Sequence, residues 1–207
     1  MKNICFYDTD TQKDFMEKAR PIYVPGAEAI KLNLAELTRY ALQNGYSIMG
    51  SVDRHSESDA ELKVFVKHCM DKTEGQKKIP ETSVANSAFI ENRAYSANEL
   101  KRLMSATAVY FEKQEINVFS NANANLLIRF DAAVVYGVAT EYCVKEDVLG
   151  MIRRGLDVFV VEDAIAGITP DGEAKAIEEM KSAGARFIKT KDVLEGRVEE
   201  MLREMWR

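Results

Sequence analysis

The sequence has few of the residues that build cross-linked, membrane-spanning or nucleic-acid-binding proteins. It contains three cysteines, two histidines, four prolines and one tryptophan among 207 residues. The cysteines are widely spaced and odd in number, which fits free thiols in a reducing compartment better than a disulfide framework. No apolar run is long enough to span a membrane, no signal peptide precedes the first strand-like run, and no basic block is present. These absences argue against membrane and nucleic-acid partners and predict a cytoplasmic protein.

What is present is the composition of an ordinary globular domain. Hydrophobic residues make up 46% of the chain and charged residues 29%, with a formal net charge of −5. A chain of this length predicts a single domain over residues 1–207. Short apolar runs alternate with amphipathic stretches, which predicts a Rossmann-like, three-layer αβα fold with a mostly parallel, six-stranded sheet.

The expected elements follow from this alternation. The strands are Asn3–Tyr7, Tyr46–Val52, Ala106–Phe111, Ala132–Val138, Asp157–Val161 and Arg186–Lys189. The helices are Glu28–Asn44, Asn98–Met104, Tyr142–Arg154, Gly172–Ala183 and Asp192–Met205. The charged, irregular stretch Asp71–Tyr95 is expected to run over the surface.

Cys143 stands where a strand-like run turns through Gly137 and Thr140 into a helix-like run. Unpaired N–H groups and the dipole at a helix N-terminus favour the thiolate over the thiol. Because the thiolate is the nucleophilic form, this position indicates acyl-transfer chemistry. The alternative is a small buried residue at a strand–helix junction, where most free cysteines lie.

Two charged residues follow the ends of other expected strands. Asp10 comes just after the first strand and Lys113 just after the third. The carboxyl ends of parallel strands meet at one edge of a sheet, so both side chains are expected near Cys143. There Asp10 would act as a general base, and Lys113 would stabilise the thiolate and a developing oxyanion.

Both histidines of the chain lie close together in the sequence, beside a carboxylate. Asp53 and His55 follow the second expected strand, and His68 comes shortly after them. Two neutral imidazoles and one carboxylate form a ligand set for a divalent transition metal that keeps open positions. The sequence therefore predicts one divalent metal ion and leaves Zn, Fe and Mn as equal alternatives.

Taken together, these segments resemble the isochorismatase-like cysteine hydrolases, and among them the nicotinamidases. The resemblance covers most of the chain. It is carried by TDTQKDF at Thr9–Phe15, by Asp53-Arg54-His55, by His68-Cys69, by Lys113 and most specifically by GVATEYCV at Gly137–Val144.

The resemblance implies a role for each matching residue. The catalytic triad would be Asp10, Lys113 and Cys143, and the metal ligands would be Asp53, His55 and His68. The peptide between Val138 and Ala139 would be cis, and the N–H groups of Ala139 and Cys143 would form an oxyanion hole. The substrate pocket would include Phe15, Phe65 and Val138.

The implied reaction is hydrolysis of nicotinamide to nicotinate and ammonia through a Cys143 thioester, a step of NAD salvage. The metal would hold the pyridine nitrogen and orient the ring. The partner would be a small-molecule amide, and oligomers are common among the similar proteins. This sequence departs from the family's pattern before His68, where Phe65-Val66-Lys67 replaces a Trp-Pro stretch, and at Glu141, where Asp is usual.

Other functions fit parts of the sequence. Within the family, isochorismate or a carbamoyl compound or another amide could be the substrate. A haloacid-dehalogenase-like phosphatase would use Asp8 and Asp10, with acids from the run Val160–Ile168. A metal-water hydrolase would use Asp53, His55 and His68 alone.

Overall fold

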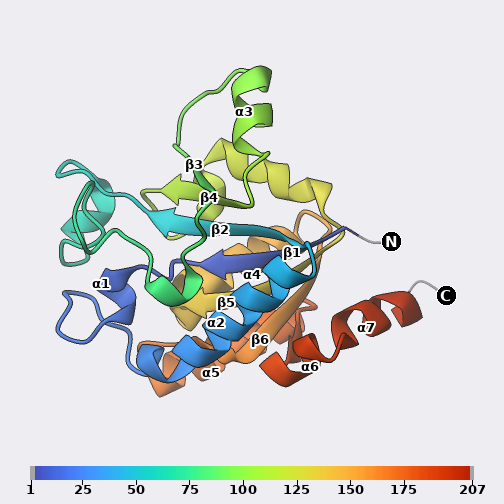
Figure 1. The fold of residues 1–207 in the computed structure, drawn as a ribbon. Helices are drawn as coiled ribbons and strands as arrows, with labels where there is room; N and C mark the ends of the chain where they lie inside the picture. Colours follow the sequence, from blue (N-terminus) through green and yellow to red (C-terminus); the bar gives the residue numbers. More distant parts are fainter. Residues whose placement is uncertain (1–2, 206–207) are drawn as a thin grey trace.

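A parallel sheet lies between two layers of helices in the computed structural model, which describes residues 3–205 (Figure 1). The strands are β1 (Ile4–Thr9), β2 (Ser47–Asp53), β3 (Ser87–Ile90), β4 (Ala108–Lys113), β5 (Ala132–Val138), β6 (Asp157–Ala166) and β7 (Arg186–Ile188). Their order across the sheet is β3-β4-β2-β1-β5-β6-β7, and every neighbouring pair is parallel. The predicted three-layer fold with a parallel sheet is confirmed.

Helices cover both faces of this sheet. They are α1 (Lys13–Met16), α2 (Ala27–Gln43), α3 (Ala97–Leu103), α4 (Lys145–Ile152), α5 (Pro170–Ser182), α6 (Thr190–Leu194) and α7 (Arg197–Met205). Side chains of α2, α6 and α7 share one hydrophobic core with the sheet, and those of α4 and α5 share a second core on the opposite face. No helix within residues 3–205 is long and apolar enough to cross a membrane.

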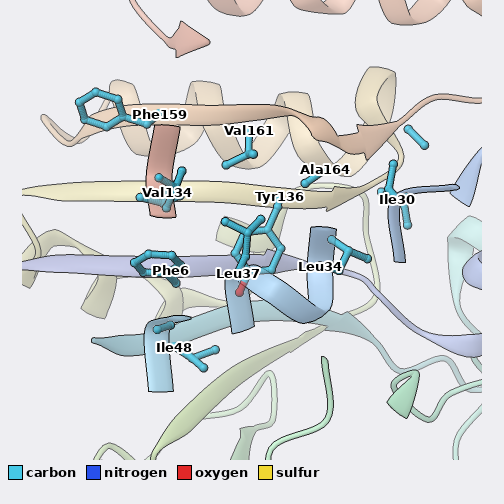
Figure 2. Packing of buried hydrophobic residues seen from close by; sticks show 14 of the residues in the cluster. Phe6, Ile30, Leu34, Leu37, Ile48, Val134, Tyr136, Phe159, Val161 and Ala164 are labelled. Carbon is cyan, nitrogen blue, oxygen red and sulfur yellow. The ribbon is translucent and has the colours of Figure 1, made fainter. Parts of the chain in front are cut away.

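The packing of α2 follows directly from its sequence. Ile30, Leu34 and Leu37 recur at three- and four-residue steps, so they share one face of the helix. Figure 2 shows this face lying against the sheet, where Phe6 and Val134 belong to the same cluster. Burying these side chains holds α2 across the centre of the sheet and so fixes the strands on either side of it.

Several element boundaries differ from the sequence-based expectation. The sheet has seven strands instead of six, because β3 pairs with β4 inside the stretch expected to be irregular. Among the four residues of β3, only Ile90 is buried, so an edge strand of this kind leaves no apolar run to find. The expected C-terminal helix is two helices, α6 and α7, separated at Gly196, which has a φ of +77°.

The parallel arrangement brings four strand ends to one rim of the sheet. Asp53 at the end of β2 is in register with Lys113 at the end of β4. Thr9 at the end of β1 is in register with Gly137 near the end of β5. Residues that are far apart in the sequence therefore lie side by side where the candidate site was expected.

Gly137 lets β5 approach β1 closely at this rim. Its φ is +122°, and a Cβ at this position would lie 2.0 Å from the carbonyl oxygen of Thr9. We therefore expect Gly137→Ala to destabilise the fold by at least about 2 kcal/mol, from backbone strain and overlap together. Urea unfolding measures this loss. The control is Gly155→Ala, which has a φ of +88° but open space around its Cβ and should cost only about 1 kcal/mol. Equal losses in the two variants would contradict the role assigned to close strand approach.

Candidate active site

A fully buried lysine joins the polar residues at this rim. The Nζ atom of Lys113 lies 2.9 Å from Asp10 Oδ2, donates a hydrogen bond to Asp53 Oδ1, and lies 3.5 Å from the Sγ atom of Cys143. The four residues come from the position just after β1, from the ends of β2 and β4, and from the turn after β5. The structure therefore brings together the three residues that the sequence proposes as a triad, and it adds Asp53 to them.

The segment Thr9–Phe15 organises the rim beyond supplying Asp10. The side chain of Gln12 accepts from the Asp53 N–H and donates to the Asp53 carbonyl oxygen, both at 2.7 Å. The carboxylate of Asp14 accepts from the Cys69 N–H at 2.8 Å, next to His68. One short segment thus fastens both the strand that ends at Asp53 and the loop that carries His68.

Cys143 lies in a single π-helical turn, Thr140–Val144, that leads from β5 into α4. The peptide bond between Val138 and Ala139 is cis, as the resemblance implied. Glu141, at the position where the family usually has Asp, accepts hydrogen bonds from the N–H groups of Ile168 and Thr169, at 2.9 Å for the shorter contact of each. The longer acid therefore fastens this turn to the start of α5.

Burial shapes the protonation of the rim. Burial raises the pKa of Cys143 well above its ordinary value, although Lys113 acts in the opposite direction. The sequence predicts that the helix N-terminus lowers the pKa of the Cys143 thiol. That prediction is wrong, because burial raises this pKa. Burial also raises the pKa of Asp10, against the effect of Lys113 and of a hydrogen bond from Cys143. A carboxyl group with a raised pKa is a stronger base, which suits it to take the proton of a thiol.

Asp53 also faces a cluster of nitrogen and oxygen ligands. Its Oδ2 lies 3.3 Å from His68 Nε2 and 3.6 Å from His55 Nε2, and Glu61 Oε1 lies 4.0 Å from His68 Nε2. Ligands about 2.0–2.2 Å from a tetrahedral ion stand roughly 3.4 Å apart, so the spacing around Asp53 Oδ2 suits a zinc-like ion. Burial opposes the charge of Asp53, but Lys113 and the two histidines lower its pKa, so it is an anionic ligand.

The outer ring nitrogens of both histidines are already engaged. Asp59 Oδ2 lies 3.2 Å from Nδ1 of His55, and the carbonyl oxygen of Val66 lies 2.8 Å from Nδ1 of His68. Such contacts fix the tautomer that leaves Nε2 free to bind a metal. The Nε2 atom of His55 is buried and makes no hydrogen bond to the described part of the chain. A buried acceptor left in this state fits a metal ligand, so the cluster of Asp53, His55, Glu61 and His68 can hold a divalent ion.

A mostly apolar cavity of about 160 Å³ opens between the metal cluster and the thiol. Its polar lining comes from Asp53, Glu61, His68 and Cys143. The remaining lining residues are Phe15, Ile22, Val24, Phe65, Ile116, Ala139, Tyr142 and Ile168. Phe15 and Phe65 lie in the wall, as expected from the sequence. Val138 is instead fully buried in the hydrophobic core and does not line the cavity, whereas its neighbour Ala139 does.

Two residues of the site, Glu61 and Gln12, could not be identified from the sequence. Glu61 lies in a short 3-10 helix, Ala60–Lys63, within a stretch rich in charged residues, where one more acid does not stand out. Gln12 lies in the Thr9–Phe15 segment of the resemblance, but its residue type and position predict no role for it. Its role depends on the distance between two strands, which no local pattern reveals.

Comparisons with known proteins agree with this geometry. The family model described as "Isochorismatase domain" matches residues 8–192, most of the chain. The chain belongs to the isochorismatase family of hydrolases. A protein of Arabidopsis thaliana named "probable inactive nicotinamidase" is 21% identical over 189 residues, which are 89% of this chain and 91% of that protein.

Two other relatives complete the comparison. The nicotinamidase/pyrazinamidase of Mycobacterium tuberculosis is 34% identical, but over 58 residues that are 28% of this chain and 31% of that protein. The crystal structure of the pyrazinamidase of Pyrococcus horikoshii in complex with zinc superposes with a TM-score of 0.73 at 24% identity. It covers 90% of this chain and 99% of the other. The isochorismatase fold is therefore shared along nearly the whole chain.

The geometry of the metal cluster predicts which substitutions weaken the binding of a divalent ion. We expect His55→Ala to lose a stoichiometric divalent ion, because it removes one of two imidazole ligands. Asp59→Asn should weaken binding about 10–100-fold, because it loosens the orientation of His55. Elemental analysis and competition with a chelator measure both effects. Glu57→Gln, which changes an exposed acid on the same loop, is the control. Wild-type metal content in His55→Ala would contradict the ligand assignment.

Proposed function

We propose that this protein is a cysteine amidohydrolase that hydrolyses nicotinamide to nicotinate and ammonia. The observation that carries the proposal is the single cavity that the Cys143 thiol shares with the metal cluster. A flat pyridine ring can lie between the apolar walls, with its nitrogen toward the cluster and its amide carbon toward Cys143. The reaction belongs to the salvage of NAD in this proposal.

The charge of the cavity favours a neutral substrate. The ionisable lining residues in the described part of the chain are two acids, a histidine, a tyrosine and the thiol, and no lysine or arginine is among them. Isochorismate carries two carboxylates, and only an ion at the metal cluster could pair with one of them. The other would lie unpaired in an apolar cavity and would be costly to bury. A neutral amide has no such cost, so it is favoured over isochorismate.

The first half of the proposed reaction forms the thioester. Asp10 takes the Cys143 proton, and the sulfur attacks the amide carbon to form a C–S bond. The backbone N–H groups of Ala139 and Cys143 would hold the oxyanion, and loss of one such donor typically costs about 10²–10³ in rate. Asp10 then returns the proton to the amine as the C–N bond breaks, and ammonia leaves.

The second half regenerates the enzyme. Asp10 takes a proton from water, and the hydroxyl oxygen attacks the thioester carbon. The C–S bond then breaks to release the carboxylic acid, and Asp10 returns the proton to the Cys143 sulfur. Lys113 stays charged throughout and keeps Asp10 in place. When bound at Asp53, His55, Glu61 and His68, a divalent metal supplies a Lewis acid for the ring nitrogen. Such fixed orientation is worth several kcal/mol of the barrier.

The phosphatase alternative needs Asp8 and a late acid such as Asp163 beside Asp10, and both of these carboxylates are engaged elsewhere. The Asp8 carboxylate lies 2.8 Å from Lys78 Nζ and accepts from the hydroxyl of Thr11, and it does not line the cavity. Asp163 accepts hydrogen bonds from Thr190 instead of facing Asp10. The metal ligands that a metal-water hydrolase would need are present, but that alternative does not explain why Lys113 contacts Cys143.

The proposal is tested by removing the thiol. Cys143→Ala should abolish ammonia release from nicotinamide while its metal content stays at the wild-type level, because the thiol is the nucleophile and not a ligand. Cys5→Ala, which removes a thiol buried near the start of β1, should keep its activity. Ammonia release by Cys143→Ala, combined with its loss in His55→Ala, would overturn the proposal in favour of a metal-water hydrolase.

The raised pKa of Asp10 predicts the acid limb of the pH profile. Asp10 must be ionised to act as a base, and a raised pKa means that it keeps its proton at pH values where an ordinary aspartate has lost it. Activity should therefore fall with decreasing pH, with a midpoint above the ordinary value of 3.8. The measurements are kcat/KM for nicotinamide and the rate of Cys143 alkylation by iodoacetamide, which needs no metal. A midpoint at or below 3.8 in both would contradict this assignment.

A further inference from the structure

Behind the triad lies a second buried carboxyl group, that of Asp147. It belongs to α4, one helical turn beyond Cys143, and it does not line the cavity. Its Oδ2 lies 3.2 Å from the hydroxyl of Ser51, and its Oδ1 accepts a hydrogen bond from the Val118 N–H at 3.2 Å. The same Ser51 hydroxyl lies 2.7 Å from Asp10 Oδ1. Ser51 therefore stands between the proposed base and a second acid.

The number of hydrogen atoms available between Asp10, Ser51 and Asp147 limits how the two acids can be protonated. A serine hydroxyl has one hydrogen to donate, and an ionised carboxylate can only accept. Ser51 therefore cannot donate to two ionised carboxylates at once, so both of its contacts are hydrogen bonds only if one of the two acids carries a proton. Asp10 has the Lys113 ammonium at 2.9 Å, which favours its charged form. Asp147 is bonded to a hydroxyl and a backbone N–H, so the proton belongs on Asp147.

The surroundings of Asp147 agree with this count. The titratable and charged groups that face it are Tyr7, Asp10, Lys113 and Cys143. Burial, followed by the charge of Asp10, raises the pKa of Asp147 to about 8, against the effect of Lys113. At neutral pH its hydroxyl hydrogen then points to Ser51, and the hydrogen of Ser51 points to Asp10.

We propose that Asp147 is a positioning residue that remains protonated and acts through Ser51 to hold the Oδ1 atom of Asp10. The proposal rests on the proposed function only in taking Asp10 as the base. With Oδ1 held by Ser51 and Oδ2 held by Lys113, the carboxylate has one orientation toward the thiol. Because Asp147 does not touch the cavity, its loss affects the rate of the reaction and not the binding of substrate.

Asparagine is the sharpest test, since its amide copies a protonated carboxyl group at this position. The amide oxygen can accept from Val118 and the NH₂ group can donate to Ser51. Asp147→Asn should therefore keep kcat within about threefold of wild type. Asp147→Ala removes the donor and should lower kcat about tenfold or more with KM unchanged. Asp163→Asn, a matched change away from the rim, should leave kcat at the wild-type value.

A Ser51→Ala variant distinguishes an effect of Asp147 through hydrogen bonds from an effect of Asp147 on packing. In a Ser51→Ala background, Asp147→Asn and Asp147→Ala should have the same kcat, because the link to Asp10 is already broken. The rate of Cys143 alkylation by iodoacetamide should follow the same pattern. That readout requires no substrate, so failure to hydrolyse any amide would defeat the proposed function and leave this proposal testable. If the single variants Asp147→Asn and Asp147→Ala, which both keep Ser51, had equal activity, the proposed role of Asp147 would be overturned.

The protonation of Asp147 has a separate readout in stability. The folded protein keeps a proton on Asp147 up to about pH 8, whereas an ordinary aspartate releases it near 3.8. The stability of the wild type must then fall through this range as pH rises, and asparagine, which does not titrate, removes the fall. The advantage of Asp147→Asn over wild type in urea unfolding should grow from pH 5 to pH 8. An advantage that stays constant or shrinks would show that Asp147 is ionised and would overturn the proposal.

Discussion

The buried ammonium of Lys113 is the interaction on which the rim depends. It lies between the carboxylates of Asp10 and Asp53, on three neighbouring strands, with the thiol of Cys143 beside it. A buried charge is tolerated only when it is paired and hydrogen-bonded, so each of these groups requires the others. Asp53 gives Oδ1 to the lysine and turns Oδ2 toward the two histidines. The metal cluster and the triad are therefore one electrostatic unit that shares a single carboxylate.

The resting state of the thiol follows from this unit. At an exposed helix N-terminus, free N–H groups would favour the thiolate, which is why the sequence predicted a lowered pKa. In the structure Cys143 is buried among anionic neighbours, and burial raises its pKa instead. The site therefore gains nothing from a preformed thiolate and needs a base next to the sulfur. Asp10, whose own pKa is raised by burial, is placed to be that base.

Much of this site could be predicted from the sequence because it follows from one geometric rule. Apolar runs locate the strands, and the rule that parallel strands end at one rim brings Asp10, Lys113 and Cys143 together. The prediction failed where a role depends on distance. The edge strand β3 has no apolar pattern of its own, and Glu61 lies among other acids. Ser51 and Asp147 show their link only when α4 packs on the sheet and the hydrogen atoms between them can be counted.

The charges around the cavity also affect how product would leave. With Asp147 protonated as proposed, the rim holds Lys113 against Asp10 and Asp53, and a neutral amide enters without changing that balance. The proposed reaction converts the amide to a carboxylic acid, which loses a proton at neutral pH and becomes an anion. That new charge would form at the Cys143 end of the apolar cavity, near Asp10 and near a Lys113 ammonium whose charge Asp10 and Asp53 already balance. Repulsion and poor solvation would both favour its departure, so a cavity suited to a neutral amide is also one that rejects the acid made from it.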